Sequence, residues 1–333
     1  MHPALFHQVL NDVNPDSPPY ALPDGSAAKL LILGEEVSEE SMMDPNSTDW
    51  WPSAKSLKIA SKLRRRIMRE GFVLQVCMAL CTALVSELYT TTSGAGSGQK
   101  RVRLRFKTAP IADFGICAGS VDVKNQDKLA YWMLDGEMFK GQDPDDHYWI
   151  YFITMRGEEF ILDCAMFTFN MCMMVPTGPY LPPQDADLFP FAPAFFLDRL
   201  IRNNTPAPLL HKERRRVSIL RNSKVHESMR SGATDNFTAA DMKRLCGVMG
   251  EIAGRACTPT ERDLFMIWMM QSCIRLEECL KREDWKRFPV QPNICVEQDP
   301  GEMDDLDNKK ADWYKTMKKW KREHRMKKVS EVS

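Results

Sequence analysis

Two residues whose types cooperate in catalysis, His147 and Asp163, lie at the ends of a predicted β-hairpin. His147 begins the segment HYWIYFIT, Asp163 ends EEFILD, and Arg156-Gly157-Glu158 forms a tight turn between them. In an antiparallel pair, the start of one strand lies beside the end of its partner, so we expect the two side chains to lie close together. A carboxylate beside an imidazole fixes its tautomer and stabilises its protonated form. Such a pair could serve as the base for a nucleophile.

The nucleophile for this pair would be a cysteine. Residues 72–89 are apolar on nearly all sides, which predicts a buried helix, and they include Cys77 and Cys81. Cys77 is closer to Gly71 and therefore to the helix N-terminus, whose dipole can lower the pKa of a thiol. The apolar surroundings of Cys77 equally fit an inert thiol in the core. Both interpretations stay open at this point.

The chain order of these elements resembles that of the transglutaminase-like and arylamine N-acetyltransferase-like branch of the papain-fold enzymes. There, a cysteine near the start of a buried helix precedes a histidine strand and an aspartate strand. The resemblance covers residues 70–170. It implies a cysteine-dependent acyl-transfer or amide-hydrolysing enzyme with Cys77 as nucleophile, His147 as base and Asp163 as orienting carboxylate, and with Cys81 as the competing nucleophile. The alternative is a non-catalytic interaction protein with a degenerate papain-like core or an unrelated α+β core.

The elements around these residues predict an α+β fold with a papain/transglutaminase-like core, in which a buried helix precedes an antiparallel sheet, and a helical C-terminal part. Apolar residues recur at helical spacing over residues 53–70, while residues 111–123 and 128–134 are plausible strands. Helices are predicted over 239–254 and 260–284, and Thr258-Pro-Thr-Glu261 supplies capping chemistry for the second.

Composition divides the chain into five predicted regions. They are a partly disordered N-terminal arm with a short strand or helix at Leu30–Leu33 (1–52), the α+β core (53–175), a Pro-rich crossing and linker that avoids regular ladders (176–235), a helical subdomain (236–295), and an acidic linker with a basic C-terminal helix (296–333).

Charge bears on the partners of the chain. Lys plus Arg and Asp plus Glu are 45 each among 333 residues, so no global field favours nucleic acid. Locally, Lys309–Lys328 is basic, with Trp313, Met317 and Trp320 at helical spacing. This predicts a segment that docks on an acidic protein or nucleic acid, or alternatively a terminal helix that covers the core. A second basic segment, His211–Ser218, resembles a basophilic kinase site.

We expect no metal and no cofactor from the sequence. The ten cysteines include no Cys-x-x-Cys motif, which favours reduced thiols, and the carboxylates of Asp143, Asp145 and Asp146 fit a solvated turn. The N-terminus lacks the pattern of a secretory signal, and the longest apolar run is shorter than the ~18–20 residues of a membrane span. These features predict an intracellular protein, cytoplasmic or nuclear, without a membrane span.

Overall fold

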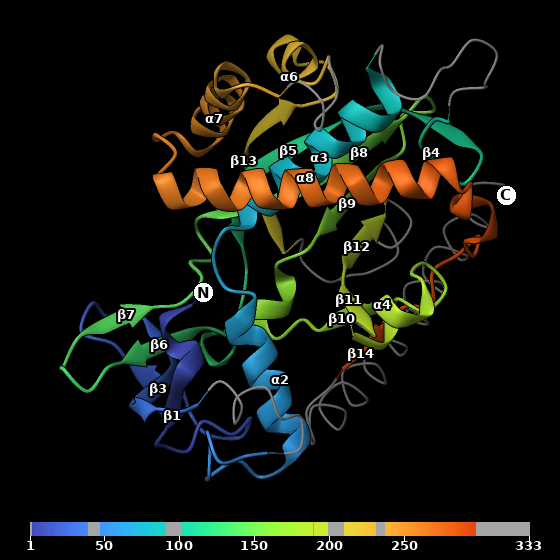
Figure 1. The fold of residues 1–333 in the computed structure, drawn as a ribbon. Coiled ribbons are helices and arrows are strands. Elements are labelled where there is room, and N and C mark those ends of the chain that lie inside the picture. The colour runs from blue at the N-terminus through green and yellow to red at the C-terminus, as the bar shows by residue number, and fades with distance from the viewer. Residues whose placement is uncertain are drawn as a thin grey trace, which may run out of the picture.

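The computed structural model describes residues 2–38, 47–90, 102–188, 190–198, 210–230 and 237–297. Helices and antiparallel sheets are mixed along the chain, and the predicted α+β class is confirmed (Figure 1). The predicted basic helix at 309–328 lies outside the described residues, and the boundaries of the five regions stay predictions.

A six-stranded antiparallel sheet lies at the centre, in the order β12-β9-β8-β5-β13 with β4 paired to β5. Its strands are β4 (Arg105–Phe106), β5 (Ala109–Val121), β8 (His147–Thr154), β9 (Glu159–Asp163), β12 (Phe195–Asp198) and β13 (His211–Ser218). The predicted β8–β9 hairpin is confirmed, with Ile150 opposite Leu162. Gly157 has φ +75° in the turn, a conformation that favours glycine.

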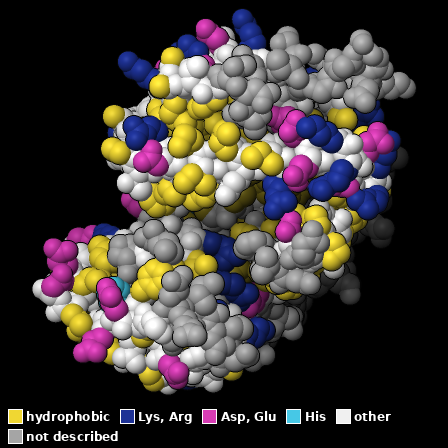
Figure 2. Space-filling model, viewed as in Figure 1, with side chains coloured by type: hydrophobic (Ala, Val, Ile, Leu, Met, Phe, Trp, Pro, Cys, Tyr) yellow, Lys and Arg dark blue, Asp and Glu magenta, His cyan; other side chains and the backbone are white. Residues whose placement is uncertain are grey.

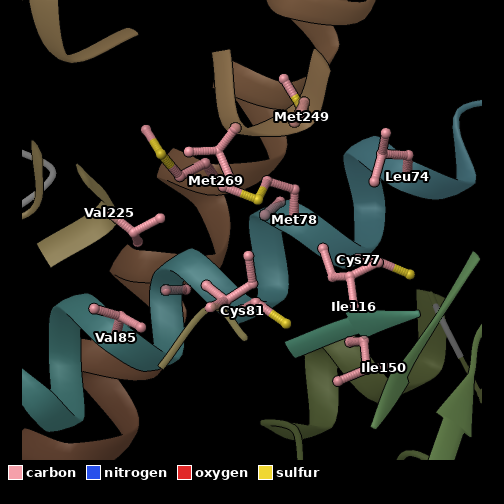
Figure 3. Packing of buried hydrophobic residues seen from close by; sticks show 14 of the residues in the cluster. Leu74, Cys77, Met78, Cys81, Val85, Ile116, Ile150, Val225, Met249 and Met269 are labelled. Atoms are coloured by element: carbon pink, nitrogen blue, oxygen red, sulfur yellow. The ribbon is translucent and has the colours of Figure 1, made fainter. Parts of the chain in front are cut away.

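Helices cover one face of this sheet. The buried helix predicted at 72–89 is observed as α3 (Val73–Leu84), which continues into the π-helical turn η2 (Val85–Tyr89). Side chains of α3 pack on Ile116 and Ile150 of the sheet and on methionines from α7 and α8 (Figure 3). The outer helices are α6 (Ser223–Ser228), α7 (Ala239–Ala253) and α8 (Pro259–Lys281), with η5 (Asp284–Arg287) after α8.

The predicted capping chemistry of α8 is confirmed. The Thr258 side chain accepts from the backbone N–H of Glu261, and the Glu261 side chain accepts from the backbone N–H of Thr258. Several apolar side chains of α8 remain exposed, and hydrophobic side chains gather on that part of the surface in Figure 2: Met266, Ile267 and Ile274. α8 packs on α3, and this contact takes up only part of the apolar surface of α8.

The N-terminal segment is more ordered than the predicted arm. It forms η1 (Pro3–Phe6), β1 (His7–Val9), β2 (Tyr20–Ala21) and β3 (Ala27–Glu36), which join β6 (Leu129–Trp132) and β7 (Met138–Lys140) in a second sheet with η3 (Asn125–Asp127) beside it. β3 pairs with β6 in parallel, and the face of the sheet packs on α2 (Leu57–Met68). β3 includes the Leu30–Leu33 cluster, for which the sequence predicted a short strand or helix. Its partner strand β6 lies about a hundred residues away along the chain, where no local pattern reveals it.

The Pro-rich crossing also differs from its prediction. The short strands β10 (Met173–Pro176), β11 (Phe191–Pro193) and β14 (Cys295–Val296) form a third sheet, with α4 (Pro183–Leu188) nearby in the chain. Prolines are tolerated there because they fall at strand ends, where a missing N–H costs little.

No single helix in the described ranges is long and apolar enough to cross a membrane. The pair formed by Leu57–Met68 and Val73–Tyr89 passes the same test on length and composition, although it is bent by 73°.

Candidate functional site

His147 and Asp163 meet at one end of the β8–β9 hairpin. Nε2 of His147 lies 2.5 Å from Oδ2 of Asp163, and both side chains are fully buried. The other carboxylate oxygen, Oδ1, accepts a hydrogen bond of 2.8 Å from the backbone N–H of Ala165. The alternation and turn thus correctly placed these two side chains together.

A second histidine, to which the sequence analysis gave no role in the site, completes a cluster. His211 begins β13, and its Nε2 lies 2.8 Å from the same Oδ2 of Asp163. Its side chain is only 5% exposed. Between β8 and β13 runs β5, in which Gly119 stands opposite His147. No side chain at this position separates the two histidine-bearing strands.

The local sequence gave little sign of His211. It precedes a run of Lys, Glu and Arg, a composition typical of an exposed edge, and it lies 48 residues after Asp163. The burial of β13 does not alternate, because its residues are half-buried at both ends and exposed from Lys212 to Arg215.

Aromatic rings enclose the His147–Asp163–His211 cluster. The His147 ring centroid lies 5.6 Å from that of Phe169, which comes from η4 (Met166–Phe169), and His211 meets the edge of Trp149 at 4.8 Å. Nδ1 of both histidines is buried and has no hydrogen-bond partner among the described residues. The cluster therefore combines strong internal hydrogen bonds with an apolar wall.

The electrostatics of the cluster favour an ionised Asp163. Burial by itself raises the pKa of Asp163, because it disfavours the charged carboxylate. The charge of His147 and the hydrogen bonds from both histidines outweigh burial and hold the pKa of Asp163 well below its usual range. An ionised carboxylate only accepts hydrogen bonds, so each Nε2 carries its proton toward Asp163.

Cys77 lies on the other side of the sheet. Its Sγ is 3.9 Å from the carbonyl oxygen of Tyr148, and it is fully buried in the cluster of Ile116 and Ile150 (Figure 3). Successive side chains of a strand point to opposite faces. Tyr148 therefore faces α3, whereas His147 faces away from it. The structure joins two of the three predicted triad residues and leaves Cys77 apart from them.

The thiols of α3 are also electronically unsuited to attack. Burial, with smaller contributions from Cys164 and other neighbours, raises the pKa of Cys77 well above its ordinary value, and burial likewise raises that of Cys81. The thiolate is the nucleophilic form of cysteine, so both side chains stay in the unreactive form at neutral pH. The catalytic role of either cysteine remains a prediction without support from these contacts.

A cleft of about 290 Å³ lies at the amino end of α3, on the Tyr148 side of β8. Gln75 lines it, is only 3% exposed and makes no hydrogen bond to any described residue. The charged side chains of the lining comprise four carboxylates, one lysine and one arginine, together with His2: Glu70, Asp143, Asp146, Glu261, Lys140 and Arg255. Carboxylates thus outnumber cations in the cleft.

The Asp143, Asp145 and Asp146 turn is exposed, as expected from the sequence. The backbone N–H of Asp145 donates to Oδ1 of Asp143 at 2.8 Å, and the Tyr148 hydroxyl donates to Oδ1 of Asp146 at 2.6 Å. The turn thus forms one rim of the cleft.

No family model, no curated protein and no solved structure matches this chain.

Proposed function

We propose that this chain acts by binding a ligand and not by cysteine chemistry. The observation that carries the proposal is the placement of Cys77 and His147 on opposite faces of β8. A histidine base activates a thiol only within hydrogen-bond reach or through one water. In this fold, the strand itself lies between the thiol and the imidazole.

A papain-like interpretation of the core remains part of the proposal in degenerate form. The order of cysteine helix, histidine strand and aspartate strand is kept by α3, β8 and β9. A working triad needs the cysteine helix on the same face of the strand as the histidine. Here α3 contacts Tyr148 and Ile150, while His147 points away from it. An interaction protein that keeps such a core for stability fits these contacts.

We place the binding site in the cleft at the amino end of α3, and we propose a small ligand with a positively charged amine. Lys140 is paired with Asp24, and Arg255 with Glu261 at 2.6 Å, so the cations of the lining are already neutralised. Asp143 and Asp146 form no ion pair within the described part of the chain. Their charge, with the Gln75 amide beside them, would favour an ammonium group that also offers hydrogen bonds.

Thiol reactivity tests the first half of the proposal. The folded protein is treated with iodoacetamide between pH 6 and 9, and alkylation is located by mass spectrometry. We expect Cys77 and Cys81 to react only after denaturation, whereas the partly exposed Cys295 serves as the reactive reference. Rapid alkylation of Cys77 below pH 8 that is lost in His147→Ala would refute the binding proposal and support the triad.

Calorimetric titration with spermidine, and with malonate as an anionic comparison, tests the second half. We expect spermidine to bind and the double variant Asp143→Asn/Asp146→Asn to bind it roughly tenfold more weakly, since each exposed charge contributes up to about 1 kcal/mol. Asp122→Asn/Asp135→Asn removes two exposed carboxylates outside the cleft and should bind as the wild type does. Equal weakening in both double variants, or binding of malonate alone, would contradict the cleft assignment.

A further inference from the structure

We propose that His147, Asp163 and His211 form a binding site for one divalent transition-metal ion. One ligand atom from each of these residues lies within 4.8 Å of the other two. The three side chains come from β8, β9 and β13 and converge on the face of the sheet that α3 leaves free. Because the cleft lies on the other face, this inference is independent of the proposed ligand.

The donor set selects the class of ion. Two imidazole nitrogens and one carboxylate oxygen suit Zn²⁺ and Fe²⁺, whereas Mg²⁺ and Ca²⁺ prefer oxygen ligands throughout. The ion provides a positive partner for the buried Asp163 carboxylate, which has no Lys or Arg ion pair within the described residues. Coordination uses the unprotonated nitrogen of a neutral imidazole, so each ring gives up its Nε2 proton and takes the tautomer with the proton on Nδ1.

The dimensions of the cluster come close to those of a coordination sphere. The Nε2 atoms lie 2.5 and 2.8 Å from Oδ2, which are hydrogen-bond distances. Metal bonds of about 2.0–2.2 Å at tetrahedral angles place ligand atoms about 3.3–3.5 Å apart. Outward movements of roughly 0.5–1 Å suffice. Such shifts are within the reach of side-chain torsions while the strands stay in register.

A support for the carboxylate is already in place. The Ala165 N–H holds Oδ1 of Asp163 at 2.8 Å and thereby directs Oδ2 toward the two histidines. Partners of this kind orient metal ligands and are part of what makes such a site bind tightly.

The burial of the cluster favours a structural ion. All three side chains are at most 5% exposed, whereas catalytic sites keep a position open to substrate. His211 lies 64 residues after His147, counted from their positions in the sequence. An ion that joins them would hold β13 to the hairpin, and its binding free energy would add to the stability of the fold.

The test uses the full chain. Purified protein is analysed for bound metals by mass spectrometry, stripped with a chelator, and titrated with Zn²⁺ in one arm and with Fe²⁺ under anaerobic conditions in the other. We expect about one ion per chain and a rise of several degrees in Tm at an ion concentration a hundred times Kd. Co²⁺ should give the visible absorption bands of a site with nitrogen and oxygen ligands.

Two matched variants assign the binding to the cluster. His211→Gln, which removes one ligand, should abolish the ion-dependent Tm shift. His226→Gln, which removes the hydrogen bond of a half-buried histidine to the Leu220 carbonyl, should lower stability and keep the shift. If His211→Gln does not fold, the wild-type metal content and Co²⁺ spectrum still decide. Absence of bound metal and of any Tm shift in the wild type, or unchanged binding by folded His211→Gln, would overturn the proposal.

Discussion

Replacement of Asp163 by asparagine is the sharpest probe of the buried cluster. Asparagine keeps nearly the same volume, and its Oδ1 can still accept from the Ala165 N–H, so no cavity forms and one hydrogen bond survives. The variant loses the negative charge to which His147 and His211 both donate. With Oδ1 held by Ala165, the amide NH₂ takes the place of Oδ2, and it donates instead of accepting from the two histidines. Its effect therefore isolates the charge of the cluster.

The expected magnitude follows from the burial of the pair. Removal of one partner from a buried ion pair typically costs about 3–5 kcal/mol, because the remaining polar groups are left uncompensated. Asp163 and His147 are both completely buried, so solvent screening does not reduce the effect. We expect the free energy of unfolding at pH 7 to fall by about 3 kcal/mol, the lower end of this range, because the Ala165 hydrogen bond remains.

The effect should depend on pH in a defined direction. The pKa of Asp163 in the folded protein lies below its value in the unfolded chain, which is about 3.9. Stabilisation by the carboxylate is therefore fully present above that unfolded value and is lost as the pH falls through the folded value. The unfolding free energies of wild type and Asp163→Asn should converge as the pH is lowered below about 4.

Urea unfolding monitored by fluorescence at several pH values measures both effects, with a chelator present so that no variant contains metal. Asp122→Asn changes an exposed carboxylate that has no side-chain hydrogen bond or ion pair among the described residues. It is the control and should change stability by less than about 0.5 kcal/mol. If Asp163→Asn is as stable as the wild type at pH 7, the cluster is not held by the carboxylate charge and the reasoning fails.

Two further substitutions probe the elements that position the cluster. Gly119→Ala should lower the free energy of unfolding by roughly 2–3 kcal/mol, because the added Cβ would overlap the Lys212 carbonyl oxygen in β13. Gly178→Ala has open space around the added Cβ and should leave stability nearly unchanged in urea unfolding. Equal effects would contradict the close packing of β5 on β13. Thr258→Ala removes the capping box of α8 and should lower the free energy of unfolding by about 1 kcal/mol. Thr260→Ala in the same turn should lower it less, and thermal unfolding compares the two variants. A larger loss in Thr260→Ala would contradict the role of the cap.

Local patterns in the sequence were sufficient to predict the β8–β9 hairpin and the start of α8. Alternation in HYWIYFIT and EEFILD with Gly157 between them predicted the hairpin, and the structure has β8 and β9 paired antiparallel. The capping residue Thr258 and the apolar spacing after it predicted the start of α8. These features depend on neighbouring residues, whose interactions are set by covalent geometry and short-range hydrogen bonds.

The membership of the sheets could not be predicted in the same way. β3 pairs with β6 and β13 pairs with β5, in each case across about ninety to a hundred residues. Such pairings are selected by the burial of whole faces, which is a property of the assembled core. The strand pairings of the N-terminal segment and of the Pro-rich crossing could not be predicted from local patterns for this reason.

The candidate site shows the same division most clearly. The sequence by itself determined that His147 and Asp163 would meet, because a tight turn between two antiparallel strands brings the start of the first beside the end of the second. Alternation also fixed that His147 and Tyr148 point to opposite faces, but it could not say which face α3 would cover. The tertiary structure decided that α3 packs on the Tyr148 side, which separates Cys77 from His147, and that His211 arrives on the other. The physical reason is that the residues of a strand determine which side chains share a face, whereas distant segments determine which of the two faces is covered.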